Sequence, residues 1–186
     1  MLKTTVSLIT TLLISTALFA QSYTITPQES KVTVTGTSTI HDWESTAEEF
    51  SGSATINMEE GKLVSIEGLT FNVLVEGIKS GKGGMDKKTY DALNEKKHPN
   101  IVFKLNDITE INADSLVANG SLTISGKTND IQMTVGYELL EDGTITFKGS
   151  KALKMTDYNV DPPTAMLGTI KAGNEVEVHF DAKFVQ

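Results

Sequence analysis

The segment from Lys96 to Val135 most constrains the fold, because in it apolar and polar residues alternate strictly over two long runs. Successive side chains of a β-strand point to opposite faces, so this alternation predicts strands with one buried face and one solvated face. A sheet with such a buried face either packs a solid core or encloses an apolar ligand, and it offers no catalytic group. The residues expected on that face are Ile101, Phe103, Leu105, Leu122, Ile124, Ile131, Met133 and Val135.

The same alternation continues along most of the chain. Turn-forming residues separate the runs, so antiparallel strands joined by short turns are expected. The final run is the clearest, with its apolar residues from Val176 to Phe184 expected to point inward and its polar residues outward. About eight such strands predict an all-β fold, either a closed antiparallel β-barrel or a sandwich, and eight strands suffice for a barrel that holds one small ligand. Besides the three strands within 101–139, strands are expected over 31–39, 50–58, 69–75, 144–153 and 176–184, after a short lead at 23–25.

One short segment, MDKKTYDALNEKK at 85–97, favours a helical insertion. Asp86 is expected to cap its start and Pro99 to stop it. Four residues are expected to share one side of this helix: Met85, Thr89, Ala92 and Leu93.

The first twenty residues have the layout of a secretory signal peptide. Lys3 precedes an apolar run from Val6 to Phe19, and the small residue Ala20 follows it. Cleavage after Ala20 leaves residues 21–186 as a single domain in the periplasm or outside the cell. The run is short and rich in hydroxyl side chains for a membrane span, so no stable membrane insertion is expected after cleavage, although an uncleaved anchor is the alternative.

Composition excludes several classes of function. The net charge is −8 and all 16 basic residues are Lys. An acidic chain without Arg lacks the basic surface that nucleic-acid binding requires. The chain also has no Cys, so it has no disulfide and no thiolate metal site, and packing alone must stabilise it.

Side chains capable of chemistry are few and scattered. The sequence has no nucleophile elbow, no phosphate-binding GxxxxGK[ST] loop and no carboxylate pair on a shared inner face, so no catalytic residue, no metal site and no enzymatic activity are expected. His41, Asp42 and Trp43 form one capable cluster at a strand end. Either they lie at a barrel mouth, with Trp43 over a ligand and His41 at its headgroup, or Trp43 simply anchors a turn.

Several landmarks resemble the YceI-like family of exported lipid-binding proteins. They are KVTVTGTSTIHDW near the start, HPNIVFK after the helical segment, GSLTISGKTNDIQMTV, and the closing DYNVDPPTAMLGTIKAGNEVEVHF. The resemblance implies a lipocalin-like, elongated barrel whose interior accepts a polyisoprenoid, an isoprenoid quinone or an isoprenoid pyrophosphate. The chain departs from the family where Met155 to Tyr158 replace an Arg followed by Asp-Phe, and where KSGKGGMDKK replaces an Arg-Asp pair. Both departures remove a cation and favour a neutral headgroup, such as a quinone or an alcohol.

We therefore expect a non-catalytic protein that binds, transports or stores an amphiphilic isoprenoid lipid, with no cofactor other than that lipid. A structural or interaction module with a filled core is the first alternative, an enzyme acting on an isoprenoid is the second, and a homodimer is left open. His41, Trp43 and Tyr158 are expected at the mouth beside the headgroup. The residues expected to line the ligand are Phe71, Val73, Val75, Phe103, Leu105, Leu122, Ile124, Met133, Val135, Tyr137, Phe147, Val178 and Phe180.

Overall fold

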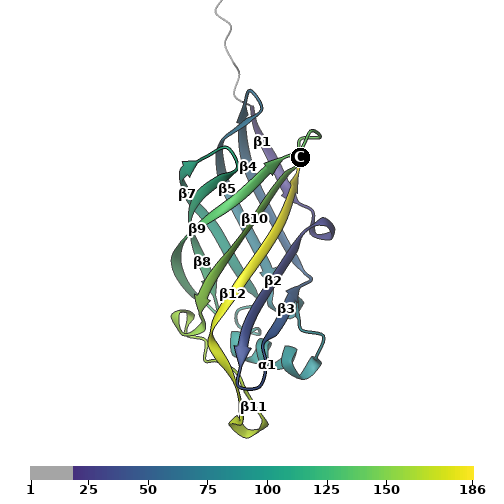
Figure 1. Cartoon of the computed structure of the whole chain (residues 1–186), viewed down its shortest axis with the longest axis vertical. Helices are drawn as coiled ribbons and strands as arrows, with labels where there is room; N and C mark the ends of the chain where they lie inside the picture. The colour runs from purple at the N-terminus through teal and green to yellow at the C-terminus, as the bar shows by residue number, and fades with distance from the viewer. Residues whose placement is uncertain (1–18) are drawn as a thin grey trace, which may run out of the picture.

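The chain folds into an elongated antiparallel β-barrel, described here by a computed structural model that covers residues 19–186. The expected all-β, lipocalin-like barrel with one helix is confirmed (Figure 1). The expected signal peptide falls almost entirely outside the described residues. The strands are β1 (Phe19–Ile25), β2 (Lys31–Ser38), β3 (Trp43–Ala47), β4 (Phe50–Glu59), β5 (Lys62–Leu74), β6 (Ile78–Lys79), β7 (Asn100–Ile111), β8 (Ser115–Ile124), β9 (Lys127–Leu139), β10 (Ile145–Lys154), β11 (Thr164–Ala165) and β12 (Ile170–Val185).

The wall is a closed meander in which each strand pairs antiparallel with the next. It contains eight strands once three interrupted ones are joined, because β1 continues into β2, β3 into β4, and β5 into β6. The long strand β12 closes the barrel by pairing with β1 at its end, through Ile25 and Phe184, and with β2 along its middle, through Val34 and Val178. Closure removes the exposed sheet edges that would otherwise pair with other chains.

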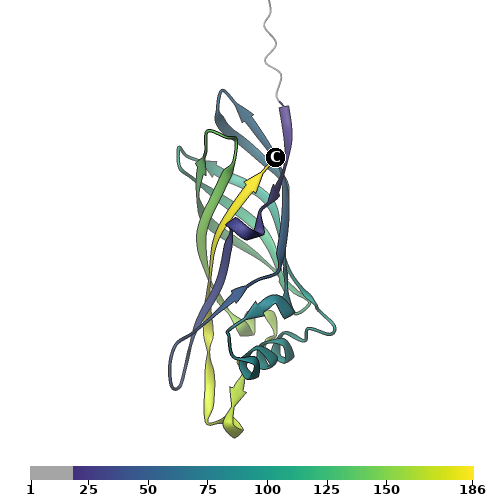
Figure 2. The same cartoon turned by 90° about the vertical axis from the view of Figure 1, so that its right-hand side faces the viewer.

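One end of the barrel is filled by side chains, and we call it the closed end. Its core includes Tyr23, Ile56 and Ile145, each no more than 2% exposed. The rings of Phe147 and Phe184 meet edge to face, with centroids 5.7 Å apart. The C-terminus and the turn between β4 and β5 lie at this end, whereas α1 (Gly83–Leu93), β11 and the β2–β3 loop lie at the other, which we call the open end (Figures 1 and 2).

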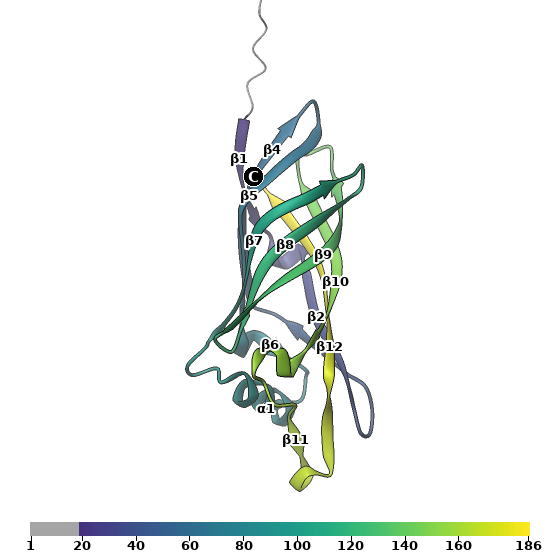
Figure 3. The same cartoon turned by 90° about the vertical axis from the view of Figure 1, so that its left-hand side faces the viewer.

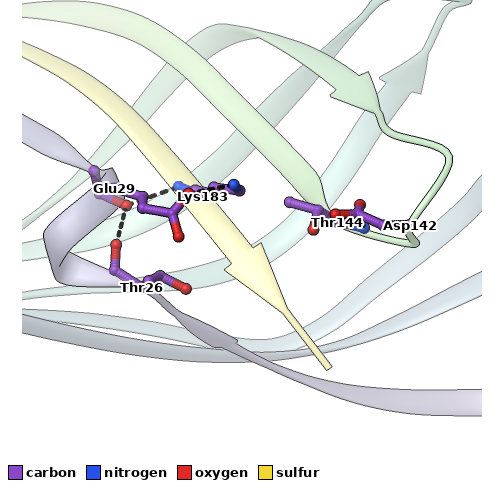
Figure 4. Close-up of polar contacts among 6 residues, drawn as sticks. Thr26, Glu29, Asp142, Thr144 and Lys183 are labelled. Carbon is purple, nitrogen blue, oxygen red and sulfur yellow. Dashed lines mark hydrogen bonds and ion pairs between the residues drawn. The ribbon is translucent and has the colours of Figure 1, made fainter.

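Polar contacts hold the barrel together near the closed end. The ammonium of Lys183 on β12 donates to the Glu29 carboxylate, and Asp142 Oδ1 accepts the Thr144 backbone N–H at 2.9 Å in the β9–β10 turn (Figure 4). The hydrogen bond that Lys183 donates to Glu29 raises the pKa of Lys183, and the hydrogen bond from the Thr144 backbone N–H lowers the pKa of Asp142. Both groups therefore favour their charged forms in the folded protein.

The helix differs from its prediction at both ends. It begins at Gly83, with Lys82 in the N-cap position and no side-chain cap, so the expected cap by Asp86 is wrong. Asp86 instead accepts the backbone N–H of Ser80 at 2.8 Å together with its hydroxyl, which fastens the preceding turn onto the helix. The helix ends at Leu93 rather than at 97, because Asn94 takes a left-handed conformation with φ of 53°, so the expected stop by Pro99 is also wrong.

Strands β9 and β10 are hydrogen-bonded to each other over only part of their lengths. β9 and β10 pair only from Gly136 to Leu139, opposite Lys148 to Ile145, and then separate. The 3₁₀ turn η3 (Met155–Tyr158) packs against β9, β10 and β12, and Figure 3 shows it as the short green coil above α1. Asn129 Nδ2 donates to the Asp157 carbonyl at 2.8 Å, which attaches η3 to β9.

Candidate ligand-binding cavity

A cavity of about 740 Å³ occupies the barrel interior between the closed-end core and the open end. Its floor is formed by residues that also belong to that core, including Ile66, Leu116 and Phe184. At the open end it is bordered by the β2–β3 loop, by α1 and by the segment from Pro163 to Met166. Volumes of this size are typical of sites that enclose a small organic ligand.

The inward face of β12 has the register expected from its alternation. Val176, Val178, Phe180, Ala182 and Phe184 all line the cavity. Their polar neighbours point outward, where Glu177 Oε2 lies 3.6 Å from His179 Nε2. The strand starts at Ile170 rather than at 176, because its first residues extend beyond the barrel wall to pair with β11.

Most residues expected to line a ligand do face this cavity. As ligand contacts they remain a prediction, but the structure brings them to one surface. The eleven that line the cavity are Phe71, Val73, Phe103, Leu105, Leu122, Ile124, Met133, Val135, Phe147, Val178 and Phe180.

Val75 and Tyr137 lie elsewhere. Val75 sits in the 3₁₀ turn η2 (Val75–Gly77), which interrupts the strand and its alternation, and it is packed away at 1% exposure with its N–H bonded to the Pro99 carbonyl at 2.8 Å. Tyr137 packs against the closed-end core, and its hydroxyl donates to the Asn112 carbonyl at 2.6 Å. The alternation along β9 points Tyr137 inward, but this residue lies too far toward the closed end to reach the cavity.

The helix contributes lining residues that were not proposed as ligand contacts. Met85, Thr89, Ala92 and Leu93 all border the cavity, so the shared side expected for this helix faces the barrel interior. Their helical spacing was the available signal. Which structure that side would cover could not be known without the tertiary fold.

His41 and Trp43 lie at the open end of the cavity, and their contacts with a ligand remain a prediction. Trp43 lines the cavity, and its Nε1–H donates to the Thr37 carbonyl at 2.9 Å. Its ring lies on Gly36, where an added Cβ would come within 2.4 Å of the ring. His41 also borders the cavity, in a loop held by the Ser38 hydroxyl, which donates to the His41 carbonyl at 2.6 Å. Trp43 is thus an anchor of the turn and part of the cavity wall.

Tyr158 occupies the gap between β9 and β10 and lines the cavity. It is 3% exposed, and its hydroxyl, which lies near the Asn129 side chain, is the one buried side-chain polar atom in residues 19–186 that makes no hydrogen bond of good geometry. Burial raises the pKa of this phenol, so it stays protonated. A buried, unpaired hydroxyl can donate to a carbonyl or accept from an alcohol on a bound molecule.

The three histidines do not converge. His41 lies at the mouth, His98 packs against Gly126, and His179 points outward beside Glu177. No group of three or more His, Cys, Asp or Glu side chains able to hold a metal ion occurs in the described part of the chain. Within the same residues, no helix has the length and apolar character needed to cross a membrane.

A closed eight-strand antiparallel barrel with an apolar cavity open at one end defines a lipocalin-like binding barrel. The model of the YceI-like domain matches residues 23–184, and the chain belongs to this family. A comparison with curated proteins found no match.

Solved structures share the fold at low sequence identity. BcnA of Burkholderia cenocepacia is 20% identical with a TM-score of 0.72, and the match covers 87% of this chain and 99% of BcnA. A polyisoprenoid binding domain from Saccharophagus degradans, implicated in plant cell wall breakdown, is 11% identical with a TM-score of 0.66, over 87% of this chain and 97% of that domain. A YCEI protein of Campylobacter jejuni is 19% identical with a TM-score of 0.57, over 73% and 80% of the two chains.

Proposed function

We propose that the protein binds an amphiphilic isoprenoid-type lipid, a quinone or a polyprenol, inside its barrel and carries or stores it without catalysing a reaction. The observation that carries the proposal is the apolar cavity of about 740 Å³, which is closed at one end and open at the other. The similarity to the polyisoprenoid binding domain of Saccharophagus degradans supports the choice of ligand class. The signal-like pattern of the first twenty residues supports a site of action in the periplasm or outside the cell, with 21–186 as the mature domain.

The chain of the ligand supplies most of the affinity in this proposal. Each buried methylene contributes about 0.8 kcal/mol, so one five-carbon unit brings roughly 3 to 4 kcal/mol. Three units bring about 10 kcal/mol, against an association cost of about 4 to 15 kcal/mol. Affinity is therefore expected to rise steeply with the number of isoprene units and to level off once the cavity is full.

The headgroup lies at the open end, where polar groups are sparse. Lys82, Lys88 and Lys154 border the cavity, and each can meet an anion only as a single point charge. The chain has no Arg to grip a pyrophosphate in two places. The unpaired Tyr158 hydroxyl suits a quinone carbonyl or an alcohol, so a neutral headgroup is favoured.

A filled-core module is the main alternative, and the cavity argues against it. Ile131, for example, borders the cavity and belongs to none of the packed core clusters. A module of that kind would bind no lipid.

Native mass spectrometry tests the proposal directly. Mature protein is incubated with a total membrane lipid extract, desalted and measured without denaturation. We expect an adduct whose released mass is that of a quinone or polyprenol. Only empty protein, after incubation with quinones and polyprenols of several chain lengths, refutes the proposal.

A further inference from the structure

Large apolar side chains are exposed at the open end of the barrel. Ile40 is 60% exposed, Met166 73% and Leu167 fully exposed, and we call these three residues the tip. Ile40 and Met166 also border the cavity, so apolar surface continues from the interior to the outside. Apolar surface that is exposed and continuous with a binding cavity marks a docking site.

Two separate loops form the tip and are bonded to each other. Ile40 belongs to the β2–β3 loop, and Met166 and Leu167 to the 3₁₀ turn η4 (Met166–Gly168) between β11 and β12. The Thr39 N–H donates to the Lys171 carbonyl at 3.0 Å, and its hydroxyl donates to the Thr169 carbonyl at 3.3 Å. Hydrogen bonds therefore join the two loops that carry the tip, and the turn between β11 and β12 is the extremity of the molecule that Figures 1 and 3 show below α1.

The backbone of η4 directs its apolar side chains outward. Met166, Leu167 and Gly168 all have positive φ, of 49°, 55° and 89°. Such values are unusual for bulky residues and are found where surrounding structure enforces them, commonly at functional sites. The side chain of Leu167 consequently gains no burial within the protein.

Charge is divided between the two ends of the barrel. The turns at the closed end, within 59–62, 110–115 and 138–144, carry seven carboxylates and one Lys. The segments at the open end, within 38–43, 79–99, 124–128 and 154–171, carry nine Lys and six carboxylates. A protein that is acidic overall thus presents its positive end together with its exposed apolar side chains. This pairing complements a lipid bilayer that contains anionic headgroups.

We propose that the open end docks on the surface of an anionic lipid bilayer, with the tip inserted among the headgroups and the surrounding Lys side chains against lipid phosphates. Docking places the cavity mouth against the acyl chains. An apolar ligand then passes between bilayer and barrel without crossing water. The docking itself stands on the tip and the charge division, whereas its use for ligand transfer rests on the proposed function.

Flotation of mature protein with ligand-free vesicles tests the docking. We expect binding to vesicles of phosphatidylcholine with a fraction of phosphatidylglycerol, weaker binding to pure phosphatidylcholine, and release as salt rises, because screening weakens the Lys contribution. Leu167→Ser should weaken binding by about tenfold, since burial of one Leu side chain is lost. Leu167 does not border the cavity, so this variant should still take up lipid in solution.

The closed end provides a matched control. Val64 and Leu140 are 39% and 37% exposed and lie in or beside closed-end turns, so Val64→Ser with Leu140→Ser should leave vesicle binding within about twofold. Failure of the native protein to float with anionic vesicles overturns the proposal, and so does equal weakening by the tip and closed-end variants. If the native protein does not bind vesicles and a tip substitution changes only the oligomeric state, the tip contacts a second copy of the chain. That result also overturns the docking proposal. Because the vesicles carry no ligand, these outcomes are independent of the mass spectrum that tests lipid uptake.

Discussion

Replacement of one isoleucine in the closed-end core and of one that borders the cavity should show whether the barrel interior is packed along its whole length or contains a cavity. Ile145 is 0% exposed within the closed-end core, whereas Ile131 borders the cavity and belongs to none of the packed core clusters. Ile145→Ala removes fully packed atoms and should lower the free energy of unfolding by about 3 kcal/mol, within the usual 2 to 5 kcal/mol. Ile131→Ala removes atoms that contact protein on one side only, so a loss of about 1 kcal/mol is expected.

The melting temperature of the lipid-free mature protein measures this difference. For a domain of this size each kcal/mol shifts the melting temperature by about 2 to 4 °C, so Ile145→Ala should lower it by about 6 to 12 °C and Ile131→Ala by about 2 to 4 °C. The order should reverse for binding. Ile131→Ala loses contact with a bound chain and should weaken quinone affinity about fivefold, while Ile145→Ala should leave it nearly unchanged.

Quenching of Trp43 fluorescence is a suitable binding assay, because this single Trp of the chain borders the cavity. Val64→Ala, at a surface position that is 39% exposed, serves as the control for both measurements. Equal destabilisation by the two isoleucine substitutions would show that the barrel is packed evenly along its length. That result would refute the cavity argument and support a filled-core module.

Three further changes test particular contacts. Gly36→Ala should displace the Trp43 ring, because an added Cβ would lie 2.4 Å from it, and the Trp emission maximum should shift. An unchanged emission spectrum would contradict this packing. Tyr158→Phe removes a buried hydroxyl that makes no hydrogen bond of good geometry, so the free energy of unfolding should stay unchanged or rise by about 1 kcal/mol, as measured by chemical denaturation. The same substitution should weaken quinone affinity about fivefold in a fluorescence titration. A clear loss of stability would show that the hydroxyl has a partner. Asp142→Asn should lower the melting temperature at neutral pH but not in strong acid. The hydrogen bond from the Thr144 N–H lowers the pKa of Asp142 in the folded protein. Its contribution to folding stability is therefore present above the ordinary pKa of 3.8 and is lost as the pH falls through the folded-state pKa. A difference in melting temperature between the variant and the native protein that persists in strong acid would contradict this assignment.

Which side chains of a strand point inward was largely determined by the sequence, because it depends only on local backbone geometry. In an extended chain, a residue and its second neighbour must share a face, so the alternation from Val176 to Phe184 sufficed to place five side chains inside the barrel. The same rule failed at Val75, where a 3₁₀ turn interrupts the strand. Within strands, sequence alone thus separated inside from outside.

Whether the inside is hollow or filled was decided only by tertiary structure. Ile145 and Ile131 are the same residue type and both point inward, yet Ile145 is buried in the closed-end core and Ile131 borders the cavity. Strand tilt and barrel closure set how far along the barrel each of them lies. The position of Tyr158 likewise depends on where β9 and β10 separate, which neither strand encodes by itself. The exposure of Leu167 beside the mouth depends on residues some 130 positions apart, Thr39 and Thr169, meeting at one end of the barrel. Local alternation determined the wall, and long-range pairing determined the cavity, its mouth and its tip.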